Sequence, residues 1–254
     1  MIIKPKIPDI LQFITQTHEV EANKQGSIVN PIDPGHKIEE VNFQTAEDTL
    51  NKKKQNPFVH GHLAAIFYSI DKLLDTPDYP ARSLITLSDL DNNAQWLKYL
   101  NNLALSPLIQ ACNFELTKIG TWRTDLASNL LTPAPSPFIL PIIMFNWLTK
   151  LKSIHDKVKP NIDNPYGISK EDYKIMTEFT NDIPLFFSTV QPFAYANNRF
   201  GRLIQNIVRM GWNMPILFNI GDKYDQFKID LDIYQRTKLQ EIVKQANLDK
   251  NKHM

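Results

Sequence analysis

The sequence predicts an all-α fold, and three observations support that prediction. The 254 residues include only 8 glycines against 17 prolines. Neither Asn-Gly nor Asp-Gly occurs, although these dipeptides dominate two-residue β-hairpin loops. Apolar residues instead recur at intervals of three and four, which is the spacing of one face of an α-helix. We therefore expect an all-α protein.

The first predicted helices lie before residue 106. An apolar stripe begins at Leu63 and continues to Leu74, and Pro77 ends that segment. Ser88 has the position of an N-cap, because acidic residues follow it in the first turn. The helix behind Ser88 carries an apolar face formed by Leu90, Ala94, Leu97, Leu100 and Leu103 or Leu105.

Prolines and further stripes place the remaining helices. A proline-rich link at residues 131–137 leads into a helix that starts near Phe138, and residues 157–169 are expected to form another loop. The next stripe begins at Leu203 and ends at Gly211. A last stripe covers residues 237–246.

Composition and charge exclude several classes of protein. Hydrophobic residues make up 43% and charged residues 22%, as in ordinary globular domains. The net charge of +1 argues against binding nucleic acid by bulk electrostatics, and the single Cys112 excludes a disulfide framework. The most apolar run, residues 138–148, is too short to span a membrane and is interrupted by Pro141. We expect a cytoplasmic protein, or a secreted effector that acts in a host cytosol. The sequence does not indicate the oligomeric state.

Residues 191–215, QPFAYANNRFGRLIQNIVRMGWNMP, form a loop that runs directly into an amphipathic helix. The unpaired N–H groups at such a helix start favour a phosphate. Arg199 and Arg202 lie three residues apart and so project from neighbouring points of the first turn. This arrangement suits a polyphosphate cradle. The alternative is that both arginines lie on the surface of an ordinary helix. Phosphate-binding loops use glycine at the positions that Ala196 and Asn198 occupy here, which favours this alternative.

This stretch resembles the motif of the Fic family, H-P-F-x-[DE]-G-N-G-R-x-x-R. The residues that match it in register are Pro192, Phe193, Asn197, Arg199 and Arg202. Residues 120–124, GTWRT, are similar to the start of the family's flap, and LTPAPSPF is similar to its proline-rich link. The resemblance implies a helical bundle with a short β-hairpin flap at residues 122–129, between Trp122 and Asn129, where a target protein would dock. It divides the chain into an N-terminal helical extension (1–90), a Fic-like core (91–235) and a C-terminal helix or tail (236–254).

The chain departs from the family motif at the positions that carry catalysis. The family's general base, a histidine, is replaced by Gln191, whose amide cannot accept a proton; a positioned base contributes about 10²–10⁴ in rate. The metal-binding acid is replaced by Tyr195, a poor ligand for Mg²⁺, so no metal ligand is assigned. The string Ala-Asn-Asn-Arg is nearer the A-N-K-R of the Doc branch, whose members are kinases. The resemblance still implies nucleotide contacts, with ATP or another nucleotide, from Phe193, Ala196, Asn197, Asn198, Arg199 and Arg202.

An inhibitory segment is also implied. The run from Thr17 to Ala22 resembles the family's [ST]-x-x-x-E-[GN] helix, in which Glu21 would pair with Arg202. Thr237 and Glu241 satisfy the same short pattern. Among the histidines, His60 and His62 have no evident third metal ligand, and His155 is expected to be a satisfied helix-end residue.

Three functions follow as hypotheses. The first is a catalytically degenerate member, or pseudoenzyme, that binds a nucleotide or a protein without transferring AMP. The second is an active transferase that moves AMP or another phosphate-containing group onto a Ser, Thr or Tyr hydroxyl of a target protein. The third is an all-α interaction module without a nucleotide.

Overall fold

The computed structural model describes residues 61, 64–66, 68–69, 94–109, 115–127, 133–162, 168–217 and 222–252. The named α-helices are α6 (Gln95–Leu105), α8 (Leu140–Ile162), α9 (Lys170–Val190), α10 (Asn197–Gly211) and α11 (Asp222–Lys252). The short 3₁₀ helices are η2 (Ser106–Leu108), η3 (Leu116–Lys118) and η4 (Pro137–Ile139). Within these ranges no strand forms, so the all-α prediction is confirmed.

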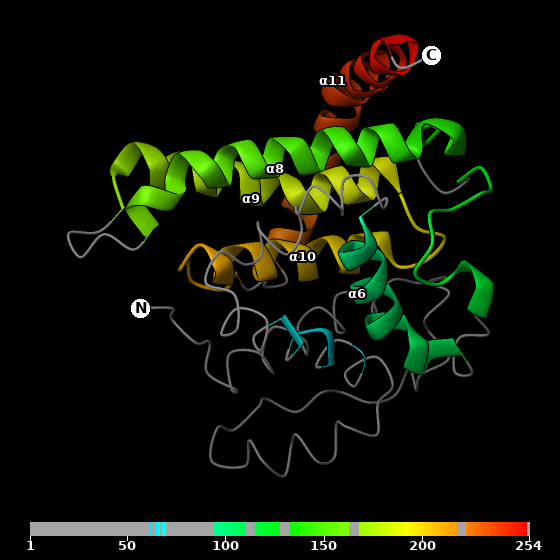
Figure 1. Ribbon diagram of the computed structural model, residues 1–254, viewed down its shortest axis with the longest axis horizontal. Coiled ribbons are helices and arrows are strands. Elements are labelled where there is room, and N and C mark those ends of the chain that lie inside the picture. The colour runs from blue at the N-terminus through cyan, green and yellow to red at the C-terminus, as the bar shows by residue number, and fades with distance from the viewer. Residues whose placement is uncertain are drawn as a thin grey trace.

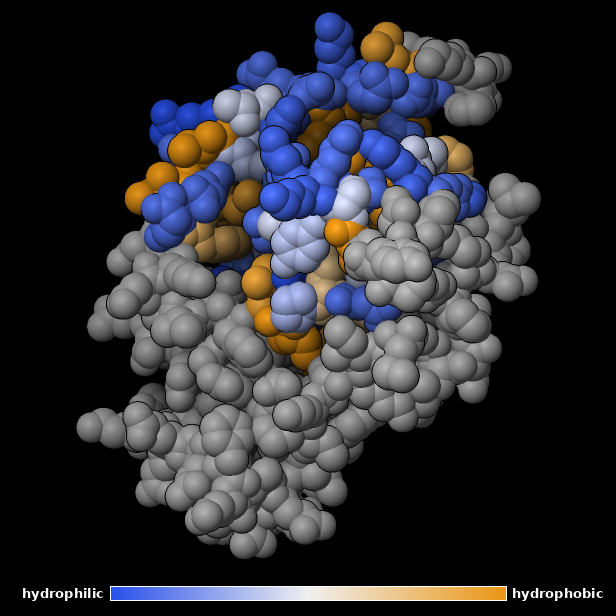
Figure 2. Space-filling view, turned by 90° about the vertical axis from the view of Figure 1, so that its left-hand side faces the viewer, coloured by the Kyte–Doolittle hydropathy of each residue, from blue (hydrophilic) through white to orange (hydrophobic). Residues whose placement is uncertain are grey.

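Helices α8, α9 and α10 lie one above another, and α11 runs behind them and projects beyond α8 (Figure 1). On the face drawn in Figure 2, polar and charged residues interleave with smaller apolar areas. None of the described helices has an apolar stretch long enough to cross a membrane.

Helix α10 is buried on almost every side, including most of its polar residues. Gly201 is what allows α9 to approach it so closely. A Cβ atom at this position would lie 2.9 Å from Cβ of Phe187 and 3.0 Å from Cα of Pro184. Since Pro184 presents backbone atoms there, any side chain at Gly201 would push α9 and α10 apart.

Aromatic rings fill the space between α8, α9 and α10. Trp147 on α8 stacks on Phe186 and meets Phe187 edge to face, with ring centroids 5.6 and 5.4 Å apart. At the far end of α10, Trp212 donates a 3.1 Å hydrogen bond from Nε1 to Nδ1 of His155. His155 is buried inside α8, so its expected place at a helix end was wrong, although its role is structural as expected.

Several predicted boundaries differ from the structure. Helix α6 begins at Gln95, because Ala94 is left-handed (φ 57°) and interrupts any continuous helix from Ser88, which lies outside the described residues. Helix α8 continues through residue 157 to Ile162, where a loop was expected. Its buried Leu151 and Val158 belong to the core and hold this end of the helix, although an interior proline removes one backbone hydrogen bond and its ring crowds the preceding turn.

The sequence analysis did not predict α9, which has Pro184 in its interior. Two signals for this helix were present. Ser169 caps its start by accepting a 3.0 Å hydrogen bond from the Asp172 N–H, and two acids stand in the first turn. The buried positions Met176, Phe179, Ile183, Phe187 and Val190 have helical spacing.

The structure confirms some of the remaining predictions and does not test others. The helix predicted to end at Gly211 does so, and the stripe at 237–246 lies in α11. The expected boundary between residues 235 and 236 falls inside this same helix. Residues 1–60 lie outside the described part of the chain. So do residues 128–129 of the expected flap, whose described residues 122–127 make a single isolated antiparallel bridge, from Trp122 to Phe193.

Candidate functional site

The candidate site is built on the loop that joins α9 to α10. Gln191 ends α9 in a left-handed conformation (φ 48°), with its N–H bonded to the Phe187 carbonyl at 3.0 Å. Ala196 precedes α10, also left-handed (φ 56°). Between these two residues the chain reverses its direction over five peptide units, from α9 into α10. Neither is a glycine, so both carry a steric cost.

Asn197 closes this loop. Its Oδ1 accepts a 2.9 Å hydrogen bond from the Phe193 N–H, and its Nδ2 donates a 2.8 Å bond to the Phe193 carbonyl. The side chain is 8% exposed. Both hydrogen-bonding atoms of the amide are thus used inside the protein, and the expected contact of Asn197 with a nucleotide stays a prediction.

Arg199 and Arg202 are buried, at 3% and 1% exposure. The interpretation as two surface arginines was therefore wrong. The guanidinium of Arg202 lies 5.0 Å from the ring centroid of Phe227 on α11, a cation–π contact. Asn198, in the same first turn, is half-buried.

The polar residues of the second half of α10 have structural roles. Arg209 donates from Nε to the Pro215 carbonyl at 2.7 Å and from Nη1 to Oγ1 of Thr180 at 3.0 Å. Burial lowers the pKa of Arg209. Gln205 donates to the Thr180 carbonyl, and Asn206 bonds both backbone groups of Leu217.

A cavity of about 180 Å³ lies between the loop and the expected flap segment. The loop contributes Gln191, Phe193, Ala194 and Tyr195, and the other wall consists of Lys118, Arg123, Asp125, Leu126 and Ala127. The structure thus brings together the two positions at which the motif departs most, Gln191 and Tyr195. Ala196, Asn197, Asn198, Arg199 and Arg202 are not among its lining residues.

Arg123 ties the flap segment to the loop. Its N–H donates to the Pro192 carbonyl at 2.9 Å, and its Nε donates to the Gln191 carbonyl at 2.6 Å. The terminal nitrogens donate to the carbonyls of Asp125 and Pro135. The side chain is 6% exposed, and this burial lowers its pKa. Trp122 packs its ring on Phe193 beside this anchor, with centroids 5.0 Å apart.

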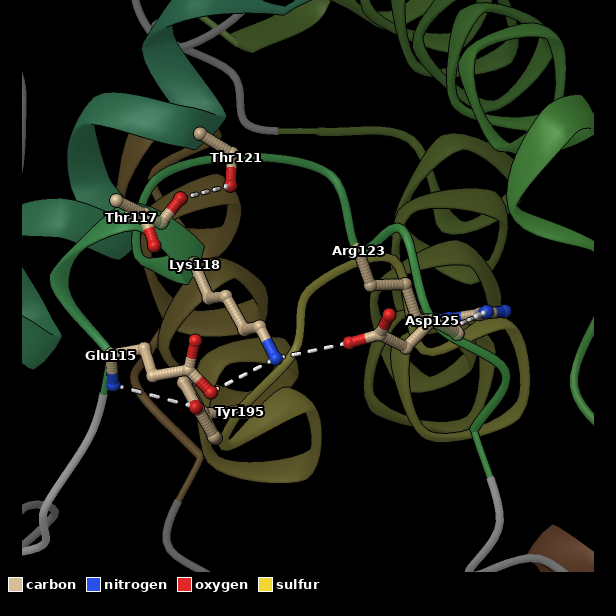
Figure 3. A network of polar contacts seen from close by, with 7 residues as sticks. All are labelled: Glu115, Thr117, Lys118, Thr121, Arg123, Asp125 and Tyr195. Carbon is tan, nitrogen blue, oxygen red and sulfur yellow. Dashed lines mark hydrogen bonds and ion pairs between the residues drawn. The ribbon is translucent and has the colours of Figure 1, made fainter.

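An ion-pair network includes Lys118 and Asp125, two of the residues that line the cavity (Figure 3). Nζ of Lys118 lies 3.0 Å from both Oε1 of Glu115 and Oδ2 of Asp125. Hydrogen bonds to Glu115 and Asp125 raise the pKa of Lys118. The Glu115 N–H points to the Tyr195 hydroxyl at 3.4 Å, which joins the network to the loop.

Some of the other predicted features lie outside the described residues, and others lie away from this site. Glu21, His60 and His62 lie outside the described residues. Glu241 pairs with Lys238 on exposed helix surface, about 21 Å along α11 from Phe227, which covers Arg202. Within the described ranges, no group of three or more His, Cys, Asp or Glu side chains gathers as a metal site would require.

Sequence reasoning missed the roles of Lys118, Arg123 and Asp125. The run GTWRT drew attention to Arg123 but did not indicate what the guanidinium binds. Its acceptors come from three segments, which only the folded chain brings together. For the pairing of Lys118 with Asp125, the sequence carries no signal.

The fold and the site define a class of protein: an all-α bundle whose central, almost fully buried helix follows a short loop closed by a flap-like segment. This fold is similar to that of Fic-1 from C. elegans, with a TM-score of 0.51 and 15% identity over 94% of this chain. A variant of the same C. elegans fragment gives a TM-score of 0.48, 14% identity and 95% coverage of this chain. No protein-family model and no curated protein matches the sequence.

The likeness to Fic-1 shows the fold alone, because so few residues are identical. The chain covers 60% and 61% of the length of these two structures. The fold that the resemblance of residues 191–202 implied is thus confirmed.

Proposed function

We propose that this chain is a catalytically degenerate Fic-fold protein, which binds a nucleotide or a partner protein without transferring AMP. The observation that carries the proposal is the lining of the cavity. Gln191 and Tyr195, which replace the family's base and metal-binding acid, both face this one space. An amide accepts no proton at neutral pH, and a neutral phenol is a poor ligand for a hard cation.

The remaining cavity residues make a poor substitute for the missing metal-binding acid. Asp125 is the one carboxylate among the residues that line the cavity, and its Oδ2 lies 3.0 Å from the ammonium of Lys118. Mg²⁺ is usually held by one or two carboxylates together with substrate phosphates. A carboxylate already paired with a lysine binds the ion less well, so metal-dependent transfer is disfavoured.

The size of the cavity limits what it holds in this conformation. At about 180 Å³ it is smaller than the 300–1,000 Å³ typical of small-molecule pockets. One phosphate group or one side chain fits such a space, whereas a whole nucleotide requires the surrounding segments to move. Arg199 and Arg202, the proposed phosphate contacts, are likewise buried and need access.

Calorimetry tests the binding half of the proposal. ATP and other nucleotides are titrated, with and without Mg²⁺, into the wild-type chain and into the Arg199→Ala/Arg202→Ala variant. We expect weak binding that Mg²⁺ changes little and that the double variant loses. Arg236→Ala on α11, where the side chain of Arg236 is 73% exposed, is the matched control and should bind as the wild type does. Circular dichroism verifies that each variant is folded.

A single revertant tests the catalytic half. Gln191→His restores the family's base but not its metal-binding acid, so labelled AMP transfer should stay near background. Robust transfer by this variant would contradict the proposal. Absence of nucleotide binding in every chain would leave protein binding, for which the wild type is compared with the Trp122→Ala variant in a partner screen.

One observation favours the alternative of an active transferase that moves AMP or another phosphate-containing group onto a target hydroxyl. Asp125 lines the same cavity as Gln191, and a carboxylate can act as a general base. Under this alternative, wild-type protein labels a target with nucleotide, and Asp125→Asn abolishes labelling. No labelling in the wild type would reject it.

A further inference from the structure

An open groove lies between the proline-rich link and the C-terminal half of α11. Its volume is about 640 Å³, and it shares no lining residue with the cavity beside Gln191. Most of its lining is apolar, with Pro133, Ala134 and Pro135 on the link and Leu239, Val243 and Leu248 on α11. Lys244 is the one charged residue among those that line it. An apolar lining that is poor in charge is typical of the centre of a protein–protein interface.

Exposed aromatic side chains stand beside this groove. Phe138 follows Pro135 in the groove wall by three residues, so the two Cα atoms lie within about 11 Å of each other. The side chain of Phe138 is 86% exposed. Phe145 is seven residues further on, on the same helical face, and is 42% exposed. Pro141, between them, is exposed as well. The start of α8 thus presents an apolar face that no other described element covers.

Contacts with α11 bring this face next to the groove. Asn146 of α8 donates a 2.9 Å hydrogen bond from Nδ2 to Oδ2 of Asp249 on α11. Leu248, the neighbour of Asp249, lines the groove and is itself 49% exposed. The short helix η4, which carries Phe138, packs on α11 too. A protruding phenylalanine and an apolar recess therefore lie close together on the same part of the molecule.

We propose that this surface binds a second copy of the chain, with Phe138 of each copy inserted into the groove of the other. A projection beside a recess of matching chemistry is self-complementary, and a twofold axis between them satisfies both copies at once. A small apolar ligand would fill the groove but leave Phe138 exposed, whereas a second copy covers both. Pro133 and Pro135 have no N–H, so the link cannot pair with an extended peptide as a sheet edge does. The net charge of +1 per chain opposes association little.

Analytical ultracentrifugation of the full chain tests the proposal. Between about 1 µM and about 0.5 mM, a range that includes weak complexes, the average mass should rise toward that of two chains. Phe138→Glu should weaken association by at least about thirtyfold, the effect of losing an aromatic anchor. Leu248→Asp alters the receiving groove instead, and should weaken association by at least about tenfold. Circular dichroism verifies that each variant is folded, and either variant serves if the other is not.

Ile229→Glu is the matched control. Ile229 is 53% exposed on the same helix, about 28 Å along α11 from Leu248, and its substitution should leave association unchanged. Thiol cross-linking then tests which parts of the two copies meet. In a Cys112→Ser background, chains with Phe138→Cys are mixed with chains with Gln240→Cys, since Gln240 lines the groove. Mild oxidation should join one chain of each kind, which mass spectrometry identifies.

A chain that stays monomeric at about 0.5 mM would overturn the proposal, as would association that Phe138→Glu and Leu248→Asp both leave unchanged. Disulfides that form only between two Phe138→Cys chains would overturn the insertion of Phe138 into the groove. A monomeric chain that binds a hydrophobic dye, with binding lost in Leu248→Asp, would assign the groove to a small apolar ligand and would reject the second copy.

Discussion

Both ends of α10 are held by an asparagine side chain that bonds a neighbouring backbone, but the two ends differ in backbone strain. At the start, Asn197 bonds both backbone groups of Phe193; at the end, Asn206 bonds both backbone groups of Leu217. Each end is flanked by a left-handed residue, Ala196 (φ 56°) before the helix and Asn213 (φ 55°) after it. Asparagine tolerates this conformation better than alanine, which adopts it only at a steric cost.

The comparison teaches that polar residues in a motif-like pattern are often structural. Asparagine and arginine occur in both halves of α10, and the second half has no resemblance to a ligand site. There Arg209 bonds to Pro215 and Thr180 and so fixes the chain as it leaves the helix. In addition, the loop that leads into the first half lines a cavity.

The largest effect is expected at the C-terminal end of α10, where Arg209 lies. Arg209→Met keeps much of the side-chain volume but leaves the Pro215 carbonyl and the Thr180 hydroxyl without their donor. We expect a loss of about 2–4 kcal/mol in the free energy of unfolding, because buried acceptors without partners are costly. Urea denaturation monitored by circular dichroism measures it. A loss below about 1 kcal/mol would show that water replaces the guanidinium.

Asn197→Ala should cost somewhat less, about 2–3 kcal/mol, because it breaks two short, buried hydrogen bonds to Phe193. Asn206→Ala is the matched variant at the other end and should cost about 1–2 kcal/mol, since its bond to the Leu217 carbonyl is long, at 3.3 Å. The two sites lie about 13 Å apart along the helix, so their effects should add in the double variant. Strong non-additivity would mean that the two ends are coupled through α10.

The sequence predicted the apolar part of this arrangement and not its polar part. The stripe from Leu203 to Val208 indicated α10, because burial of one helix face imposes a period near 3.6. The partners of Arg123 and Asn206 could not be predicted, since they are carbonyl groups set by the path of the backbone. Arg199 and Arg202 were expected near phosphates from their spacing at a helix start and from the motif, and the sequence gave no sign that they are buried.

The site was predictable in its residue types and less so in its shape. Gln191 and Tyr195 could be singled out because a motif assigns chemistry to their positions. That both line a small cavity, opposite Asp125 and Lys118, depends on how the segment after Gly120 folds onto the loop. Gly120 is left-handed (φ 67°), and its N–H donates to Asn101 of α6 at 2.9 Å. This anchoring to α6 helps to direct the flap segment.

The smallest predicted effect is a gain, and it tests the difference between the two ends directly. Ala196→Gly relieves the left-handed strain at the start of α10, while the added freedom of glycine in the unfolded chain offsets part of the gain. We expect the free energy of unfolding to rise by about 0.5–1 kcal/mol, measured by urea denaturation. Asn213→Gly, the matched change at the other end, should bring no gain, because asparagine already accepts that conformation. Equal gains at both positions would show that Asn213 is as strained as Ala196 in the left-handed conformation. A gain at Ala196 alone means that the loop beside the cavity is held at a cost which the other end of the helix avoids.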